Sequence, residues 1–439
     1  MTSAETPRRL RILLVAESCN PKGRAGFLIG WMQAQALRRV CDVHIVTETA
    51  SRAGLIEEGL VEGQDFTIID ATPLKRGRDA IRDTIFGRES ERGWGLWQAL
   101  SLPAVAWFEW RVWGHFRKAV IAGDYDVVHR IVPISPDQPS VLAITLPKTG
   151  VPLVVGPLNG GLPWPAGYAK VRRAEGEWTS YLRASVRMVP GLVALRANAA
   201  ALLLGSRDMM ARNPAAYRDR AIYLPENGID PRRFSVTRTR RAALPLRLVY
   251  LGRLVPYKGP DLVIEAARDL LARGDATLRI VGAGPLRDTL EEQVAAYGLA
   301  GAVTVVGDVD HRQVQEELAG ADLMCAPSIR EFGGATVMEA MYMGAVPVVV
   351  DYGGPPEYVT PDCAFLLPLG DREAIIASLR DVLERIAADP APLDAMSTAG
   401  RQRARSLFEW DAKAQMLGRV YRWVLDGGTK PDLGLLPRD

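Results

Sequence analysis

The sequence predicts an α/β protein built from two successive Rossmann-like halves. Short apolar runs typical of buried parallel strands recur along the chain, and most are followed by a glycine-containing loop and a helical segment. A chain of 439 residues is too long for one ordinary hydrophobic core and suits two domains. These two observations favour two α/β domains over a single core.

Composition narrows the class of protein. Hydrophobic residues make up 48% and charged residues 24% of the chain, as in soluble globular proteins, and the net charge of +3 gives no sign of nucleic-acid binding. The four cysteines are scattered without CxxC spacing, which argues for a reducing, cytoplasmic compartment and against a zinc site. No run of about 18 apolar residues predicts a membrane span, and the short apolar run near the start is a strand rather than a signal peptide.

The first half opens with a predicted strand at 11–17, a glycine loop and a helix at about 27–39. The loop lacks G-x-G-x-x-G, which disfavours a dinucleotide site. Its glycines, Gly23 and Gly26, are either ordinary turn residues or part of a ligand loop. Further strands are predicted at 42–48, 124–129, 151–157 and 200–205.

A segment rich in arginine and tryptophan lies between residues 75 and 118. Its part from 94 to 118 combines tryptophans at helical spacing with Arg111, Arg117 and Lys118. Two interpretations remain open. The aromatic side chains pack on the N-terminal domain, as large aromatics usually do, or they contact an anionic membrane surface as a peripheral helix.

A shaped loop follows the strand at 151–157. It contains Asn159, Gly160, Gly161 and Trp164. Ligands bind at the carboxyl edge of parallel sheets, and an aromatic ring is a common platform for the apolar face of a sugar. We therefore expect these four residues to contribute to a pocket for a sugar, either an acceptor or a donor sugar, with a rigid turn as the alternative.

The second half repeats the α/β pattern. A strand at 246–251 leads into a loop with Arg253 and Lys258 and a helix at about 261–273. The remaining strands are predicted at 278–281, 303–306, 322–326, 345–350 and 365–367, and the remaining helices at about 372–387 and 395–425.

The stretch from Ser328 to Met343 organises this half. Two carboxylates, Glu331 and Glu339, flank Gly333 and Gly334, after which a helix begins. A helix start exposes backbone N–H groups and partial positive charge, which suit phosphate or sugar hydroxyls. Glu331 is expected in the loop before the helix and Glu339 about one turn inside it.

This stretch resembles the E-x7-E motif of retaining glycosyltransferases of family 4, which have the GT-B fold. The flanking Ala326-Pro327-Ser328 and Pro347-Val348-Val349 match as well, as does the G-R-x-x-x-x-K-G pattern at 252–259. The segment 225–230 is similar to the family's P-N-G-I-D. The resemblance implies two Rossmann-like domains with a cleft between them: an acceptor domain at 1–223, a donor domain at 224–411, and a last helix at about 412–439 that packs back on the first domain.

The resemblance also implies roles for individual residues. Arg253 and Lys258 hold the donor diphosphate, whose developing charge must be stabilised, while Glu331 orients the sugar and Glu339 binds the ribose. The remaining implied donor-binding residues are Gly282, Gly284, Val309, Gly333, Gly334, Ala335, Thr336, Gly23 and Gly26. His129 matches the first histidine of the family's H-x-H near the reacting centre, but Ile131 replaces the second, so His129 is either catalytic or an ordinary strand-end histidine.

The implied activity is that of a hexosyltransferase that needs no metal and no cofactor. It transfers a sugar, with retention, from a UDP- or GDP-sugar to a glycan or lipid-linked acceptor, in cell-surface polysaccharide or glycolipid assembly. The alternatives are a GT-B sugar-nucleotide epimerase and a nucleotide-sugar-binding protein without turnover. Asp308-Val309-Asp310 also matches the D-x-D of metal-dependent enzymes of another fold, which we disfavour because the Arg/Lys pair can replace a metal.

Overall fold

The computed structural model describes residues 8–23, 26–86, 94–174, 190–239 and 241–435. The chain forms two compact units, each built on a parallel sheet, and this confirms the predicted α/β class. The N-terminal unit contains residues 1–161, 172–226 and 410–433, and the C-terminal unit contains residues 162–171, 227–409 and 434–439. The short segment 162–171 therefore belongs to the C-terminal unit although it lies in the first half of the sequence.

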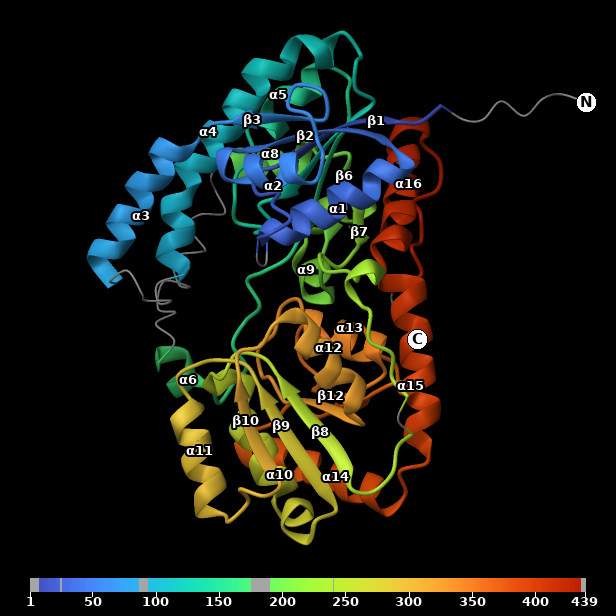
Figure 1. Cartoon of the computed structure of the whole chain (residues 1–439). Coiled ribbons are helices and arrows are strands. Elements are labelled where there is room, and N and C mark those ends of the chain that lie inside the picture. Colours follow the sequence, from blue (N-terminus) through green and yellow to red (C-terminus); the bar gives the residue numbers. More distant parts are fainter. Residues whose placement is uncertain (1–7, 24–25, 87–93, 175–189, 240, 436–439) are drawn as a thin grey trace, which may run out of the picture. The chain divides into compact units, whose positions relative to one another are not determined.

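The N-terminal unit has a seven-stranded sheet in the order β3-β2-β1-β4-β5-β6-β7 (Figure 1), with every pair parallel. Its strands are β1 (Arg11–Ala16), β2 (Asp42–Glu48), β3 (Phe66–Ile69), β4 (Val127–Val132), β5 (Leu153–Leu158), β6 (Ala201–Leu204) and β7 (Ala221–Tyr223). Its helices are α1 (Gly26–Val40), α2 (Arg52–Glu57), α3 (Thr72–Phe86), α4 (Trp94–Ile121), α5 (Leu142–Thr145), α8 (Pro190–Asn198), α9 (Arg207–Arg212) and α16 (Trp410–Asp426).

Strand β4 differs from the prediction. The sequence placed a strand at 124–129 and a loop after it, whereas the strand runs from Val127 to Val132. Ile131 and Val132 are buried, and Arg130, which reads as a loop residue, is fully buried against Glu109 of α4. A partner 21 residues away neutralises the buried charge, and local sequence carries no signal for such a pair.

Helix α16 packs on the N-terminal unit. It runs beside α1 (Figure 1), and Asp411 at its start forms an ion pair with Arg39 of α1. Tyr421 of α16 is fully buried and reaches His129 of β4. The last helix of the chain is thus part of the N-terminal unit, while the segment just before it belongs to the C-terminal unit.

The C-terminal unit has a six-stranded parallel sheet in the order β10-β9-β8-β11-β12-β13. Its strands are β8 (Leu246–Leu251), β9 (Ala276–Val281), β10 (Val303–Gly307), β11 (Leu323–Ala326), β12 (Val346–Val350) and β13 (Phe365–Leu367). The helices that follow these strands are α10 (Pro260–Arg273), α11 (Arg287–Ala296), α12 (His311–Gly320), α13 (Ala335–Met343), α14 (Arg372–Ala388) and α15 (Pro392–Arg403). Helix α6 (Ala169–Ala174) is divided between the units, because the boundary falls between residues 171 and 172.

The core of the C-terminal unit lies between its sheet and these helices. Apolar side chains of β8, β9 and β11 pack against α10 and α14, which lie side by side. Since β8 and β11 are neighbours in the middle of the sheet, the loops that follow them emerge at one edge. These two loops carry Arg253, Lys258 and Glu331.

Candidate active site

The loop after β8 is built so that its two cations project from a fixed backbone. Tyr250, buried at the end of β8, donates a hydrogen bond from its hydroxyl to the carbonyl of Arg253 at 2.8 Å. The loop then turns through a short 3-10 helix, Pro256–Lys258, and Gly259 in the left-handed region begins α10. Arg253 is exposed and Lys258 is half-buried on the same loop.

Lys258 forms an ion pair with Glu331 of the loop before α13. Both side chains are about four-fifths buried, with exposed fractions of 21% and 22%. Water and salt screen the attraction between two charges at this depth less than they screen a pair on the surface. The structure therefore brings together two residues that lie 73 positions apart and that the sequence assigned to one site.

Two glycines after β9 allow the next loop to approach the loop after β8. A Cβ atom on Gly282 would lie 1.9 Å from the carbonyl oxygen of Gly252, and one on Gly284 would lie 2.4 Å from that of Leu254. Both glycines have positive φ angles. The backbone contact is closed by a hydrogen bond of 2.9 Å from Leu254 N–H to the Ala283 carbonyl, so glycine is required at both predicted positions.

The start of α13 leaves its first backbone donors without a side-chain cap. Gly334 precedes the helix in the left-handed region, and no side chain caps the helix there. The Gly333 carbonyl accepts hydrogen bonds from the Tyr358 hydroxyl at 2.7 Å and from Asn227 Nδ2 at 3.0 Å. In a trans peptide the N–H points opposite to the carbonyl, so the Gly334 N–H is directed away from Tyr358.

Ala335 and Thr336 form the first turn of α13, and Ala335 is exposed. The first N–H groups of a helix have no partner within the helix and carry partial positive charge. A phosphate or a row of hydroxyls suits these donors. Sequence reasoning named Gly333 to Thr336 but missed Asn227 and Tyr358, which orient them from distant parts of the chain.

Glu339 lies on α13 one turn further in and is half-buried. Desolvation raises the pKa of its carboxyl to about 7, and the charge of Arg233 opposes that rise. A carboxyl with this pKa is only partly ionised at neutral pH. Hydroxyl groups of a ligand that donate hydrogen bonds to it would favour its charged form. Perturbed carboxyls of this kind concentrate at functional sites.

Val309 lies half-buried on the loop after β10, the edge strand of the sheet. The neighbouring Asp310 caps α12 and accepts a hydrogen bond of 2.8 Å from the Gln313 N–H, in a complete capping box. Asp310 therefore has a structural role as a helix cap, which argues against interpreting residues 308–310 as a metal-binding D-x-D motif. Among the residues that the structure describes, no group of three or more His, Cys, Asp and Glu side chains is arranged to hold a metal.

Trp164 belongs to the C-terminal unit and does not join Asn159, Gly160 and Gly161 there. The guanidinium of Arg330 lies over the Trp164 ring at 4.7 Å and over the Phe332 ring at 5.0 Å. Arg330, which stands beside Glu331 and is buried, was not predicted from the sequence. The predicted acceptor-binding set is thus divided between the two units.

Asn159, Gly160 and Gly161 lie together after β5 in the N-terminal unit. Both oxygens of Glu226 accept hydrogen bonds from Asn159 Nδ2, at 3.0 and 2.9 Å. The Asn159 side-chain oxygen accepts a bond of 2.9 Å from the Gly160 N–H. The Asn159 side chain therefore shapes this loop, while Gly160 and Gly161, both with positive φ, form the turn.

His129 does not have the geometry of a catalytic residue. It is fully buried; its Nε2 lies 2.8 Å from the Gly156 carbonyl and its Nδ1 lies 2.6 Å from the Tyr421 hydroxyl. A carbonyl only accepts, so Nε2 carries the proton and Nδ1 accepts from Tyr421. Burial lowers the pKa of His129 to about 4. With both nitrogens engaged, this geometry favours the alternative of a structural strand-end histidine, and a catalytic role for His129 stays a prediction.

Gly23 and Gly26 flank the start of α1. The Gly23 N–H donates to the Asn20 carbonyl at 3.0 Å, and a Cβ on Gly23 would lie 2.3 Å from the Phe27 Cβ. Gly26 is the first residue of α1. This geometry explains Gly23 as a turn residue, and its assignment to a donor site stays a prediction.

Known proteins are similar to this chain in two ways: in the sequence of the C-terminal unit and in the overall fold. Residues 239–403 match the family model for glycosyl transferases group 1. Most of the C-terminal unit is therefore similar to the group 1 glycosyltransferases. The two parallel sheets form a GT-B fold.

Among curated relatives, the chain is 29% identical over 242 residues to an alpha-D-kanosaminyltransferase of Streptomyces kanamyceticus, which covers 53% of this chain and 62% of the relative. It is 31% identical over 233 residues to a GDP-mannose-dependent alpha-(1-6)-phosphatidylinositol monomannoside mannosyltransferase of Mycobacterium tuberculosis, covering 49% of this chain and 59% of the relative. The matches thus span between about half and three fifths of the curated relatives.

Solved structures resemble the fold along nearly the whole chain. A glycosyltransferase from Rickettsia africae has a TM-score of 0.62 at 13% identity, covering 96% of this chain and 100% of the other. The Anabaena protein HepE, solved in complex with UDP and glucose, has a TM-score of 0.58 at 17% identity, covering 94% and 99%. At this identity the resemblance concerns the fold alone.

Proposed function

We propose that the protein is a metal-independent, retaining hexosyltransferase that uses a UDP- or GDP-sugar and an acceptor hydroxyl. The observation that carries the proposal is the ion pair of Lys258 with Glu331 within the C-terminal unit that also holds the uncapped start of α13. Cation, carboxylate and backbone donors together match a sugar diphosphate, which needs charge stabilisation at one end and hydroxyl recognition at the other.

In this proposal the diphosphate binds to Lys258, Arg253 and the N–H groups that begin α13. Glu331, which is paired with Lys258, accepts hydrogen bonds from hydroxyls of the transferred sugar. Glu339 accepts from the ribose hydroxyls. Gly282 and Gly284 keep side chains out of the space beside the loop after β8.

Transfer breaks the bond from the anomeric carbon to the diphosphate oxygen and forms one to the acceptor oxygen. The acceptor's proton passes to the departing diphosphate, and departure and attack occur on one face, which retains configuration. Lys258 and Arg253 stabilise the charge that develops on the leaving group, a contribution commonly worth about 10²–10³ in rate per donor.

The relatives support glycan or glycolipid acceptors as a class. One is named as a mannosyltransferase acting on a phosphatidylinositol mannoside, and another is a glycogen synthase of Mycobacterium tuberculosis, 31% identical over 207 residues, which cover 47% of this chain and 49% of the relative. We propose by analogy that this chain acts in cell-surface polysaccharide or glycolipid assembly, at the cytoplasmic side. Its free, buried cysteines fit a reducing compartment.

Helix α4 supports contact with a membrane surface. Phe108, Val112 and Phe116 are buried on one face, whereas Trp107 and Trp110 are 40% and 54% exposed on the other. The two exposed rings lie 5.1 Å apart, and the Arg111 guanidinium lies 5.8 Å from the Trp107 ring. Of the predicted segment 94–118, side chains are described from Ser101 onward.

An exposed tryptophan pair beside arginine is typical of peripheral helices at anionic lipid. No helix in the described residues has the length and apolar character to cross a membrane. Co-sedimentation with vesicles of anionic and of neutral lipid, for the wild type and for a Trp107→Ser/Trp110→Ser variant, tests this part. Equal sedimentation of both proteins would refute it.

The activity is tested by following UDP- and GDP-sugars by NMR in EDTA, with simple glycosides and polyprenyl phosphate sugars as acceptors. The proposal predicts acceptor-dependent release of the nucleoside diphosphate and a product that keeps the donor's anomeric configuration. Conversion of the donor to another sugar nucleotide without acceptor would identify an epimerase. Binding without consumption across the acceptors would identify a binding protein, and turnover restored only by manganese would refute metal independence.

A further inference from the structure

A separate cavity lies inside the N-terminal unit, beside the loop that carries Asn159 to Gly161. Its volume is about 110 Å³. The floor is apolar and comes from the ends of two paired strands: Leu158 of β5 is the register partner of Leu204 of β6, and Leu202 lies on the same face two residues earlier. The other lining residues are Pro136, Asp137, Arg196, Met209, Arg212, Asn213 and Pro214.

The polar groups of this cavity include one buried donor without a partner. Asn213 is 8% exposed, and its side-chain nitrogen is buried with no hydrogen bond among the described residues. An unpaired buried amide costs about 1–3 kcal/mol. Such a group in the wall of a cavity indicates a ligand that accepts a hydrogen bond there.

The charges around the cavity balance. Arg212 is already engaged, because it pairs with Asp208 and donates to the Gly160 carbonyl at 2.9 Å. Arg196 is half-buried on α8, and within the described part of the chain its guanidinium makes no hydrogen bond or ion pair. Asp137 also lines the cavity, and its carboxylate accepts hydrogen bonds, whereas the guanidinium of Arg196 donates them. A free donor, a free acceptor and an apolar floor match a neutral polyhydroxylated ring better than an anion.

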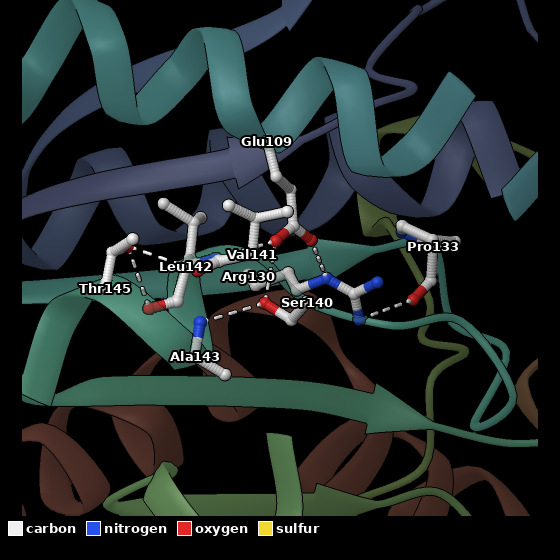
Figure 2. A network of polar contacts seen from close by, with 8 residues as sticks. All are labelled: Glu109, Arg130, Pro133, Ser140, Val141, Leu142, Ala143 and Thr145. Carbon is white, nitrogen blue, oxygen red and sulfur yellow. Dashed lines mark hydrogen bonds and ion pairs between the residues drawn. The ribbon is translucent and has the colours of Figure 1, made fainter. Parts of the chain in front are cut away.

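The wall that carries Pro136 and Asp137 is fixed by a buried polar network. Glu109 of α4 accepts from Arg130 Nε at 2.6 Å, from the Ser140 hydroxyl at 2.7 Å and from the Leu142 N–H at 3.1 Å, as Figure 2 shows. Arg130 Nη1 donates to the Pro133 carbonyl at 3.5 Å. The loop is thus held at both ends.

The same loop is also tied to the other walls of the cavity. The Asn159 N–H donates to the Ile134 carbonyl at 2.8 Å, and the Ser140 N–H donates to the Gly191 carbonyl of α8 at 3.2 Å. Five hydrogen bonds at four positions therefore connect this segment to α4, β4, α8 and the loop after β5. A binding wall held in this way is pre-organised and loses little entropy when a ligand binds.

Size restricts the occupant. Sites for drug-sized ligands enclose roughly 300–1,000 Å³, and an apolar cavity of about 150 Å³ encloses a benzene ring. A nucleoside diphosphate is therefore too large for this cavity. A single pyranose seated partly in it is compatible, with its apolar face on the leucine floor.

We propose that this cavity binds one sugar unit of the acceptor, with Arg196 and Asn213 donating to its hydroxyls and Asp137 accepting from them. This inference rests on the proposed function, because the sugar that it places in the cavity is part of the glycan acceptor of that reaction. The site is distinct from the donor residues, all of which lie in the other unit apart from Gly23 and Gly26.

The test uses the full-length protein and ligand-observed NMR with methyl gluco-, galacto-, manno- and N-acetylglucosaminide probes, and with inorganic phosphate as an anionic probe. We expect at least one glycoside to bind with a Kd on the order of 1–10 mM. Arg196→Met and Asp137→Asn should each weaken it about tenfold, as loss of a charged hydrogen bond does. Arg218→Met, an exposed arginine outside the cavity, is the matched control and should bind like the wild type.

Melting temperatures with UDP and GDP, measured on the same variants, separate the two proposals. Nucleotide binding that is unchanged in Arg196→Met, together with lost glycoside binding, is the expected result. No glycoside binding by the wild type at about 50 mM, or equal binding by all variants, would overturn the inference. Phosphate binding that depends on Arg196 would identify an anion site instead. Glycoside binding without any nucleotide binding would leave the cavity assignment standing and refute the proposed function.

Discussion

Lys258 and Glu331 form an ion pair that joins the loop after β8 to the loop before α13. The two loops follow the neighbouring strands β8 and β11, so parallel topology alone brings their carboxyl ends together. The pair couples the group proposed to hold the diphosphate with the group proposed to hold the sugar. Its integrity should therefore affect catalysis more than folding.

Lys258→Met is expected to lower kcat about 10²- to 10³-fold, because it removes a cation that stabilises the leaving diphosphate. Lys258→Arg should recover part of the rate, since it restores the charge with a different shape. Initial rates with saturating donor measure the effect. A kcat for Lys258→Met within threefold of the wild type would contradict the assigned role.

Glu339 should make donor binding depend on pH. Its pKa is raised to about 7 by burial, and ribose hydroxyls favour the ionised form, so binding is expected to release a proton. Affinity should be constant above pH 7 and should fall towards tenfold per pH unit below it. Titration calorimetry between pH 5.5 and 8.5 checks this, and Glu339→Gln should bind weakly without that dependence.

The same residue should affect stability in the opposite sense. Because the folded pKa lies above the usual value of 4.5, the folded state binds the proton more tightly, and the free energy of unfolding falls as pH rises from about 4.5 to 7. Glu339→Gln removes that loss and should be more stable than the wild type at pH 8, by roughly 1–3 kcal/mol. Equal stability of the two proteins at pH 8 would argue against a desolvated carboxyl.

Gly282→Ala tests the close approach of the two glycine loops. The added Cβ would lie 1.9 Å from the Gly252 carbonyl oxygen, so the loops must separate, at a cost of about 1–3 kcal/mol and with weaker donor binding. Gly320→Ala adds a Cβ with no atom within 4 Å and no positive φ, and it is the matched control. Urea unfolding measures the difference, and equal midpoints would be the contrary result.

His129→Phe tests the structural account of that histidine. Loss of the bonds to Tyr421 and Gly156 should destabilise the N-terminal unit by about 1–3 kcal/mol at pH 8, while kcat stays near that of the wild type. The wild-type histidine has a folded pKa of about 4 against an ordinary value of 6.5, so the unfolded state binds more protons between them. Stability should fall as pH drops from about 6.5 to 4, and this component should vanish in His129→Phe.

The parts of the fold that local pattern determines were predicted well. The helix predicted at about 261–273 and the strand at 246–251 are α10 and β8, because the apolar spacing and the loop glycines of these residues are local. Strand β4 was misplaced, because burying Arg130 requires Glu109 from another element. The transfer of 162–171 to the C-terminal unit depends on packing such as Arg330 on Trp164, which adjacent sequence does not encode.

The candidate site shows the same division. Arg253, Lys258, Glu331 and Gly334 were predicted from the motifs that the chain shares with the family, which stand next to a strand end or a helix start, and their roles stay predictions. The groups that orient them were missed: Tyr250, Asn227 and Tyr358 reach the site through side chains whose direction depends on tertiary packing. The sequence left two roles open for His129 for the same reason, since its partner Tyr421 lies 292 residues away.

The central claim is that the C-terminal unit binds a nucleoside diphosphate through Lys258, Arg253 and the start of α13. The most direct measurement is the melting temperature of the wild type and of the Arg253→Met/Lys258→Met variant, with UDP and with GDP in EDTA. A ligand that binds only the folded state raises the melting temperature. The account predicts a clear rise with at least one of the two nucleotides in the wild type and little or none in the variant. No rise with either nucleotide in the wild type, or the same rise in the variant, would contradict it.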